Sequence, residues 1–310
     1  MESIVVGIDG GGTKTRAVLA DEQGDEIAEA VGPGSAVKPQ EVKRSAEVIA
    51  AVVRDVLEQG EQRDTKPRVV CVGVAGVGRE SERQALWEAL VAEQIADEVV
   101  VQTDLAIALD DAFGDGPGVL LIAGTGSSAY ARGPTGATGR CGGWGPNIGD
   151  EGGGAWIGKR ALSVVAAASD GREPETALTG AILTAAEVSE SAELIRWAAN
   201  ATSATFASLA PVVLSVADNG DLRANSLVSL AVEELALHVR ALARQFFTDE
   251  RASIPVAFTG GLLRKGSSLR KRLEHRLKTA VPGARVHTED VDAARGAVRG
   301  ALRHLAEITA

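Results

Sequence analysis

The first third of the chain alternates short apolar runs with glycine-rich turns, a pattern that predicts strands joined by tight loops. Between these runs, apolar residues such as Val42, Ala46, Ile49 and Val53 recur at helical spacing. The strands are expected at residues 4–9, 15–20, 26–31, 69–74 and 99–101, and the helices at residues 39–59, 81–91 and 105–112. Because tight turns join the first three strands, the pattern predicts a sheet that is not purely parallel.

A similar order of elements begins again near residue 119. Strands are expected at residues 119–123 and 128–132, followed by a polar turn at 134–139 and a glycine-dense segment at 142–154. Helices are expected over most of residues 155–248, with breaks near Gly171, Gly180 and residues 218–220. A strand at 254–258, a helix that ends at Lys278, a strand at 285–287 and a last helix at 291–307 follow. The sequence has no strict residue period of the kind that marks a solenoid. It therefore predicts an α/β protein whose second half repeats the order of strands and helices of the first.

Composition narrows the classes of function. The 310 residues are 45% hydrophobic, which is enough for one large or two medium domains. A formal net charge of −10 argues against a nucleic-acid partner, since phosphate backbones require basic surfaces. Two cysteines without metal-ligand spacing, Cys71 and Cys141, fit a reducing cytosol. No apolar run approaches the roughly 18 residues of a membrane helix, and no signal peptide is expected, so we expect a cytoplasmic protein with no membrane partner.

Two glycine turns look like nucleotide-binding loops but match neither of two common patterns. The segment Asp9-Gly-Gly-Gly-Thr-Lys-Thr15 lacks the glycine that precedes the lysine of a P-loop, and a strand follows it instead of a helix. The segment at 124–129 fits the pattern G-x-G-x-x-A, but a strand follows it too, where the dinucleotide pattern requires a helix. Each turn alone is equally well explained by hairpin glycines at positive φ.

One such turn in each half favours binding of an anion. Backbone N–H groups of glycine turns converge as anion nests, and two facing nests can hold one polyphosphate. The neighbouring hydroxyls that add donors are those of Thr13, Thr125, Ser127 and Ser128. Asp9, ahead of the first nest, would hold hydrated Mg²⁺, which prefers one or two carboxylates together with phosphates and waters. A third turn at Gly260 and Gly261 suits close approach of an adenine or ribose, or is a simple turn between a strand and a helix.

Asp104 is the leading candidate for a reactive carboxylate. It follows the apolar run at 99–101 directly and precedes a helical pattern, which places it at the carboxyl end of a strand, where α/β sheets open their ligand crevices. The alternative is that Asp104 is the N-cap of that helix, since aspartate commonly starts helices.

Taken in order, these motifs resemble the actin-like ATPase superfamily of sugar kinases, actin and the 70-kDa heat-shock proteins. Within it, Cys141-Gly-Gly-Trp-Gly-Pro-Asn-Ile-Gly-Asp-Glu-Gly152 looks very like the segment C-G-G-W-G-x-x-x-G-D-E-G of eukaryotic-type N-acetylglucosamine kinases, which belong with the BadF/BcrA-type ATPases. The resemblance implies two actin-like (ribonuclease-H-like) lobes, each a mixed five-stranded sheet with helices, and ATP and sugar in the cleft between them. The N-terminal lobe would comprise residues 1–115 and 291–310, and the C-terminal lobe residues 116–290.

The resemblance also implies a reaction: ATP-dependent phosphorylation of a hydroxyl of an amino sugar or hexose, with the 6-hydroxyl of N-acetylglucosamine as the first candidate. Asp104 matches the catalytic base, and Asp9 would hold Mg²⁺ through water. ATP and phosphate contacts are implied for Gly11, Gly12, Thr13, Lys14, Gly124, Thr125, Gly126, Gly260, Gly261 and Lys265. Sugar contacts are implied for Ser127, Gly143, Trp144, Gly145 and Asp150. The family also implies a homodimer.

One position departs from the family. Members usually carry a sugar-contacting asparagine in the loop after the third strand, where this chain has Val37. Either Ser35 or Asn147 takes its place, or the substrate is another sugar, such as glucosamine or N-acetylmuramic acid. Two of the proposed sugar contacts also have structural alternatives: Asp150 as the N-cap of a helix that starts near Gly153, and Trp144 as a core residue.

Three other functions are compatible with a related fold. ROK sugar kinases share the GGGTKT-like start, but they usually carry a cysteine-rich zinc loop and an E-x-x-G-H motif, and neither motif is present here. A BadF-type activator uses ATP hydrolysis to drive an electron from an iron–sulfur cluster, and its cluster cysteines would precede the second glycine turn. A non-catalytic sensor or filament subunit would leave Asp104 idle.

Overall fold

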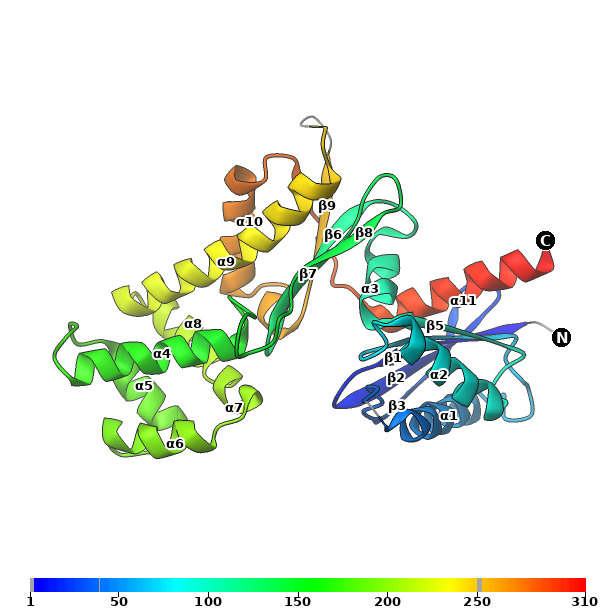
Figure 1. Cartoon of the computed structure of the whole chain (residues 1–310), viewed down its shortest axis with the longest axis horizontal. Coiled ribbons are helices and arrows are strands. Elements are labelled where there is room, and N and C mark those ends of the chain that lie inside the picture. Colours follow the sequence, from blue (N-terminus) through cyan, green and yellow to red (C-terminus); the bar gives the residue numbers. More distant parts are fainter. Residues whose placement is uncertain (1–2, 39, 250–252) are drawn as a thin grey trace. The chain divides into compact units, whose positions relative to one another are not determined.

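The computed structural model describes residues 3–38, 40–249 and 253–310, and the chain divides into two compact units (Figure 1). Unit 1 comprises Met1–Asp115 together with Val291–Ala310, and unit 2 comprises Gly116–Asp290. Unit 1 is therefore discontinuous in sequence, because the last helix of the chain packs onto the sheet that the first strands build.

Unit 1 contains a five-stranded sheet with the strand order β3-β2-β1-β4-β5. Its strands are β1 (Ile4–Gly10), β2 (Lys14–Asp21), β3 (Glu26–Pro33), β4 (Val69–Val74) and β5 (Glu98–Thr103). Its helices are α1 (Val42–Gln59), α2 (Glu80–Ala92), α3 (Asp104–Phe113) and α11 (Ala293–Thr309). Strands β1, β2 and β3 pair antiparallel, whereas β1, β4 and β5 pair parallel, so the prediction of a mixed sheet is confirmed.

Both faces of the unit 1 sheet are covered by helices, which explains why its central strands are apolar at nearly every position. Ile4, Val6 and Ile8 of β1 join the core under α1 and α2, and Val5 joins the core under α3 and α11. Between them, Gly7 lies directly under α11, where a Cβ would overlap the backbone of Val298. The missing side chain of Gly7 thus lets α11 lie close to the sheet.

Unit 2 repeats this architecture with the strand order β8-β7-β6-β9-β10. Its strands are β6 (Gly118–Ala123), β7 (Ser127–Arg132), β8 (Thr138–Gly142), β9 (Ile254–Thr259) and β10 (Ala284–Val286). Its helices are α4 (Gly154–Ser169), α5 (Ala177–Ala185), α6 (Leu194–Asn200), α7 (Ser203–Ala207), α8 (Ala210–Asp218), α9 (Leu222–Phe246) and α10 (Ser268–Ala280), with two 3₁₀ turns, η1 (Ser191–Glu193) and η2 (Gly261–Leu263). The first three strands are again antiparallel and the last two join them in parallel, so β6 and β7 occupy the places of β1 and β2.

Two predictions about unit 2 are wrong. The polar turn expected at 134–139 extends into an edge strand, β8, which pairs with β7. Its glycines make room for α9, since a Cβ at Gly139 would overlap the ring of Phe246. The break expected near Gly180 is absent because α5 runs through it, and the cost of about 1 kcal/mol for one glycine does not end a helix.

Smaller differences lie at the ends of helices. The helix predicted over residues 39–59 begins at Val42, and Pro39 lies outside the described residues. The last helix begins at Ala293 rather than at residue 291, because Asp292 caps its first turn. None of the helices that the structure describes combines the length and the hydropathy that a bilayer crossing requires.

Candidate functional site

The carboxyl ends of the parallel strands in unit 1 bring two of the candidate carboxylates to one edge of the sheet. In the register of β1, β4 and β5, Asp9 pairs with Gly73 and Gly73 pairs with Gln102. Asp104 follows Gln102 by two residues and opens α3. Asp9 and Asp104 therefore lie close enough for the charge of Asp104 to raise the pKa of Asp9.

Asp104 is not the N-cap of α3, so the capping alternative for this residue is wrong. Thr103 holds that position, and its hydroxyl accepts a hydrogen bond from the backbone N–H of Ala106 at 3.1 Å. Asp104 is the first residue of the helix itself, where the positive end of the helix dipole favours a negative charge. Because Thr103 caps the helix, the Asp104 carboxylate is left available for another role.

Burial shapes the protonation of both carboxylates. Burial raises the pKa of Asp104 above its ordinary value, while the backbone N–H groups of Leu105 and Asp104 itself oppose the shift. The pKa of Asp9 is also raised, first by burial and then by the charges of Asp104 and Asp292, against the opposing charges of Lys14 and Arg16. A carboxyl group whose pKa moves towards neutrality is a better proton acceptor for general-base catalysis than an exposed one.

The first glycine turn is held from behind by the loop after β3. Its Gly11 N–H donates to the carbonyl of Lys14 at 2.9 Å, and the Gly11 carbonyl accepts from the N–H groups of Ser35 and Ala36, both at 3.1 Å. Gly12, Thr13 and Lys14 are exposed, and the Thr15 hydroxyl, buried beneath them, donates to the Ser35 hydroxyl at 2.8 Å. The turn is therefore a fixed, exposed stretch of backbone beside Asp9.

The second glycine turn, in unit 2, is held by the start of α4. The carbonyls of Gly124 and Thr125 accept from the N–H groups of Gly154 and Ala155 at 2.8 and 2.9 Å. The hydroxyl of Ser127 donates to the carbonyl of Glu151 at 2.6 Å, so it is engaged within the protein. These bonds tie the turn at 124–126 to the glycine-dense segment that precedes α4.

Asp150 links the CGGWG segment to this turn. It adopts φ 59°, and its Oδ1 accepts from the N–H of Gly145 at 3.1 Å. Its Oδ2 would overlap a Cβ on Gly126, so a side chain at 126 would displace the Asp150 carboxylate. The N-cap of α4 is Gly153, which makes the capping alternative for Asp150 wrong. Ser127, Gly126, Gly145 and Asp150 thus form one contiguous cluster in unit 2.

Trp144 belongs to the surface rather than to the core, so the core-packing alternative is wrong. Its side chain is 67% exposed, and the neighbouring Ile148 is 76% exposed. The Arg140 guanidinium lies 6.0 Å from the centre of the indole ring. Gly143 and Gly145, on either side of Trp144, adopt positive φ and carry the chain around the exposed ring.

The third turn follows β9 and lies against the second. Gly260 has φ 95°, and a Cβ there would overlap the carbonyl of Ala123, so the fold itself requires glycine at this position. Gly261 opens the short η2 turn. Lys265 lies further on, exposed, with its Nζ 3.8 Å from a carboxylate oxygen of Glu289.

Three of the candidate glycines are not required by the fold. Gly12, Gly124 and Gly261 lie outside the positive-φ region, and a Cβ built on any of them meets no other atom within 4 Å. The explanation of the turns by positive φ therefore fails at these positions. Glycine at these positions leaves the backbone open to close approach by a group from outside the fold, such as a phosphate or ribose.

No local sequence pattern points to the charged side chains whose fields act on Asp9. Asp292 caps α11 and accepts from Arg16 at 2.5 Å, and Arg16 also donates to Glu29 at 2.6 Å. Asp292 and Glu29 are 276 and 13 positions away from Arg16 in the sequence, and no sequence pattern pairs them with it. Val37, in turn, is buried in the core under α1, which removes its side chain from any contact with a substrate.

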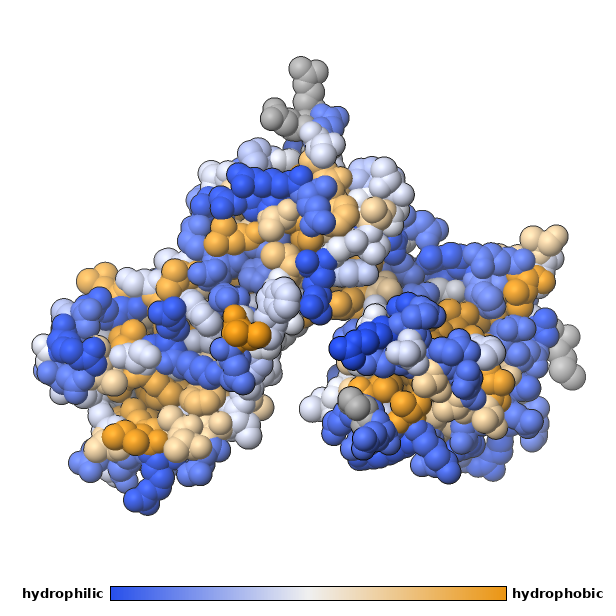
Figure 2. Space-filling view, viewed as in Figure 1, coloured by the Kyte–Doolittle hydropathy of each residue, from blue (hydrophilic) through white to orange (hydrophobic). Residues whose placement is uncertain are grey.

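A large groove in unit 2 is lined by none of these residues. It has a volume of about 870 Å³ and is lined by residues of η1, α6 and α7 and their neighbours, among them Val188, Ile195 and Trp197. Apolar residues gather over α5 and α6 in Figure 2. No residue predicted for the ATP or sugar site lines this groove, so concavity alone does not locate the chemistry.

Two sheets of the same mixed strand order, each with a glycine turn after its first strand, define an actin-like ATPase fold of the kind found in sugar kinases. The chain belongs to the BadF/BadG/BcrA/BcrD ATPase family, whose model matches residues 6–302, and the resemblance seen in the sequence is thereby confirmed.

Relatives cover nearly the whole chain. It is 28% identical over 314 residues to N-acetyl-D-glucosamine kinase of Dictyostelium discoideum, with 97% of this chain and 98% of that protein aligned. It is 29% identical to N-acetylmuramic acid/N-acetylglucosamine kinase of Clostridium acetobutylicum, over 95% of this chain and 96% of the relative. The crystal structure of a candidate N-acetylglucosamine kinase from Chromobacterium violaceum superposes with a TM-score of 0.76 at 31% identity, covering 96% of this chain and 98% of that one.

Proposed function

We propose that this protein is an ATP-dependent sugar kinase that transfers the γ-phosphate of ATP to a hydroxyl of an amino sugar, with the 6-hydroxyl of N-acetylglucosamine as the first candidate. The observation that carries the proposal is the state of Asp104: a half-buried carboxylate, not used as a cap, at the strand edge that also carries Asp9. Full-length similarity to amino-sugar kinases supports the choice of substrate class.

In the proposed reaction Asp104 accepts the proton of the attacking sugar hydroxyl. Phosphoryl transfer asks the protein mainly to position the reactants and to stabilise charge on the phosphoryl group. The backbone N–H groups of the turns at Gly11–Thr13 and Gly124–Gly126 would bind the phosphates, and the turn at Gly260–Gly261, with Lys265, would bind the rest of the nucleotide. Asp104 belongs to unit 1 and the CGGWG segment to unit 2, so the proposal assigns roles to residues of each unit.

Asp9 fits the role of a magnesium ligand through water. Its carboxylate is half-buried and lies in the field of Asp104 and Asp292, a repulsion that a divalent cation brought in with ATP would relieve. No group of three or more His, Cys, Asp or Glu side chains in the described residues is arranged to hold a metal by itself. Magnesium in nucleotide sites typically relies on one or two carboxylates, phosphates and waters, and a single Asp9 suffices for that arrangement.

The sugar would be bound by Gly143, Trp144, Gly145 and Asp150, and Ser127, whose buried hydroxyl donates to the carbonyl of Glu151, would hold this segment in place. The exposed indole of Trp144 offers an apolar face, and Asp150 offers a carboxylate acceptor. Of the two replacements for the asparagine missing at Val37, Asn147 is the better candidate because it is exposed. The Ser35 side chain is buried and its hydroxyl is engaged by Thr15.

The environments of the two cysteines argue against a BadF-type activator, which would need them to bind an iron–sulfur cluster. Cys71 lies in β4 beneath α11, and burial raises the pKa of its thiol to about 12, which opposes the thiolate that an iron–sulfur cluster needs. Cys141 lies in the CGGWG segment at the end of β8, and burial raises its pKa as well.

The test is ADP release with MgATP and a panel of N-acetylglucosamine, glucosamine, N-acetylmuramic acid and glucose. We expect sugar-dependent turnover with the highest kcat/KM for an amino sugar, and ³¹P NMR of the product identifies the hydroxyl. ATP hydrolysis that no sugar stimulates would overturn the proposal. The proposal also places the protein in the cytoplasm as a homodimer. Sedimentation of the purified protein measures the oligomeric state directly.

A further inference from the structure

Helices α3 and α11 of unit 1 touch backbone to backbone. A Cβ on Gly296 would overlap the carbonyl of Ile107 and lie 2.9 Å from the backbone nitrogen of Asp111. The side chain of Ile107 in turn fills the space over Gly73 of β4, where a Cβ would overlap it. Helix α3 is therefore held between β4 on one side and α11 on the other.

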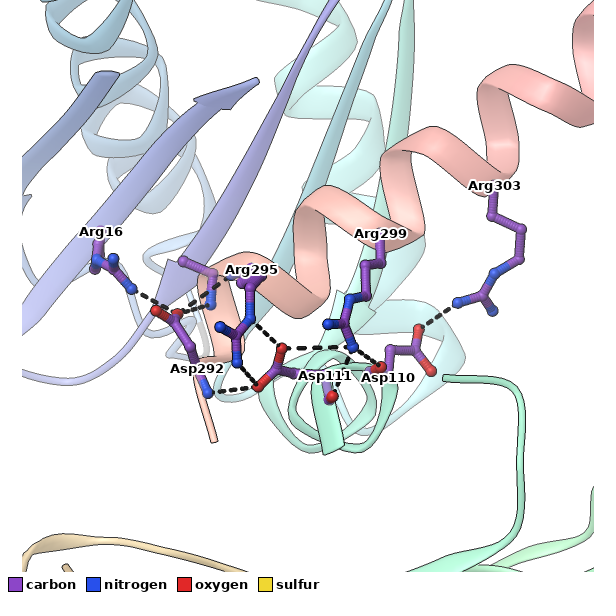
Figure 3. A network of polar contacts seen from close by, with 8 residues as sticks. Arg16, Asp110, Asp111, Asp292, Arg295, Arg299 and Arg303 are labelled. Carbon is purple, nitrogen blue, oxygen red and sulfur yellow. Dashed lines mark hydrogen bonds and ion pairs between the residues drawn. The ribbon is translucent and has the colours of Figure 1, made fainter. Parts of the chain in front are cut away.

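A buried carboxylate, Asp111, fixes the register of this contact. Its side chain is only 2% exposed, and its two oxygens accept from Nε and one terminal nitrogen of Arg295 at 2.6 and 3.0 Å. One of those oxygens also accepts from the backbone N–H of Asp292 at 2.7 Å. Figure 3 shows the fork of Arg295 around Asp111 beside the first turn of α11. Such two-point pairing holds both the distance and the angle between the helices.

Two further arginines of α11 hold the end of α3. Arg299 donates to the backbone carbonyls of Asp110 and Asp111 at 3.3 and 2.7 Å, and Arg303 pairs with the Asp110 carboxylate at 3.1 Å. Arg295, Arg299 and Arg303 are spaced four residues apart and follow one face of α11 in Figure 3. Positive charge at the carboxyl end of α3 also complements the dipole of that helix.

Asp111, which Arg295 holds, and Asp104, the proposed base, lie on the same face of α3. Asp104, Ile107 and Asp111 stand at i, i+3 and i+7, which places them in one row along the helix. Asp111 lies about 10 Å from Asp104 along the axis, at 1.5 Å per residue. A change in the tilt or register of α3 at Asp111 would therefore move the carboxylate of Asp104.

We propose that Asp111, gripped by Arg295 and by the backbone of Asp292, is a positioning residue for the Asp104 carboxylate. The proposal rests on the proposed function, because it assigns to the α3–α11 contact the placement of the catalytic base. Asp111 accepts a hydrogen bond from the backbone of Asp292, and the Asp292 carboxylate accepts one from Arg16, whose charge acts on Asp9. The same set of contacts therefore connects the helix of Asp104 with the surroundings of Asp9.

The test compares Asp111→Asn with Asp221→Asn in steady-state kinetics. Asp221 is a matched control because its carboxylate also holds two helices together, both within unit 2. It caps α9, and it accepts from the hydroxyl of Thr176, the N-cap of α5, and from the N–H of Ala177, the first residue of α5. Both variants are assayed at a temperature at which melting curves show them folded. Since a displacement of about 1 Å can cost roughly 100-fold in rate, we expect kcat of Asp111→Asn to fall at least about tenfold while both KM values stay within about threefold. Asp221→Asn should keep the wild-type kcat.

A double-mutant cycle with Arg295→Gln separates positioning from general loosening. Arg295 is half-exposed, so its replacement is expected to fold even if Asp111→Asn does not. If Asp111 acts through Arg295, the double variant should be no slower than the slower single variant. The proposal is overturned if folded Asp111→Asn or Arg295→Gln keeps a kcat within twofold of the control, or if the loss appears only in KM. Wild-type protein that phosphorylates no sugar would instead remove the proposed function, and this proposal with it.

Discussion

Replacing Gly12 with alanine separates the needs of the fold from those of the nucleotide. Gly12 lies outside the positive-φ region, and a Cβ there meets no atom within 4 Å. The folded state therefore accepts the methyl group, and the unfolded chain loses freedom, so Gly12→Ala should stabilise unit 1 by about 0.4–1 kcal/mol. For a unit of this size the melting temperature should rise by roughly 1–4 °C.

The same methyl group should weaken ATP binding. It would stand in the space where we place a phosphate, and losing one charge-assisted hydrogen bond from a backbone N–H costs about 1.5–3 kcal/mol. This corresponds to a rise of about 10- to 150-fold in the KM for ATP, with a much smaller change in the KM for the sugar. The assay is ADP release at saturating sugar, combined with thermal melting of the same preparation.

Gly180→Ala is the control. Gly180 lies inside α5, also has open space at the Cβ position and is absent from the proposed site. It should gain about 0.5–1 kcal/mol from helix propensity and keep wild-type kinetics. A Gly12→Ala protein with an unchanged KM for ATP would refute the assignment of the first turn to phosphate binding, and so would an equal change in both variants.

Three further predictions concern carboxylates. The pKa of Asp292 is lowered in the folded state because, although burial opposes its charge, hydrogen bonds from Arg16 and from the N–H of Arg295 outweigh burial. Asp292→Asn should therefore lose about 1.5–3 kcal/mol at pH 7, and the loss should shrink progressively as the pH falls below the ordinary pKa of 3.8. Urea unfolding measures this, and a loss independent of pH would contradict it. Because burial raises the pKa of Asp104, wild-type kcat should fall with decreasing pH at a midpoint above the ordinary 3.8, and a rate that is flat down to pH 4 would speak against a buried base. Asp150→Ala should raise the KM for the sugar more than the KM for ATP. Asp150→Asn, which keeps an acceptor for the N–H of Gly145, should raise the KM for the sugar less. Equal increases in both KM values would assign Asp150 to the fold alone.

Much of the fold could be predicted because local patterns encode it. The apolar strands of unit 1 and the small-residue helix at the chain's end are visible as periodicities, and the order of elements repeats in the second half. Strand β8 was missed because Thr-Gly-Arg-Cys-Gly has no apolar alternation. It is a strand only because β7 pairs with it and α9 packs on its glycines.

The candidate site was accessible from sequence only in part. Motifs at Asp9, Asp104 and the CGGWG segment are short and contiguous, so the sequence could nominate them. Whether an aspartate caps a helix depends on its neighbours, and Thr103 and Gly153 hold the caps instead of Asp104 and Asp150.

The hydrogen bonds and ion pairs that hold the site in place join residues that are distant in sequence. The clamp on Asp111 joins residues 184 positions apart, and the spacing of Arg295, Arg299 and Arg303 alone does not reveal which carboxylates they meet. Such pairs follow from the packing of α11 on α3, which no local pattern contains.

The kcat of Asp104→Asn shows whether Asp104 is the general base. Asparagine keeps the shape of the side chain and cannot accept the sugar proton as a carboxylate does. We expect a fall in kcat of roughly 10²–10⁴-fold with ATP affinity nearly unchanged. A folded Asp104→Asn protein with the wild-type kcat would contradict it.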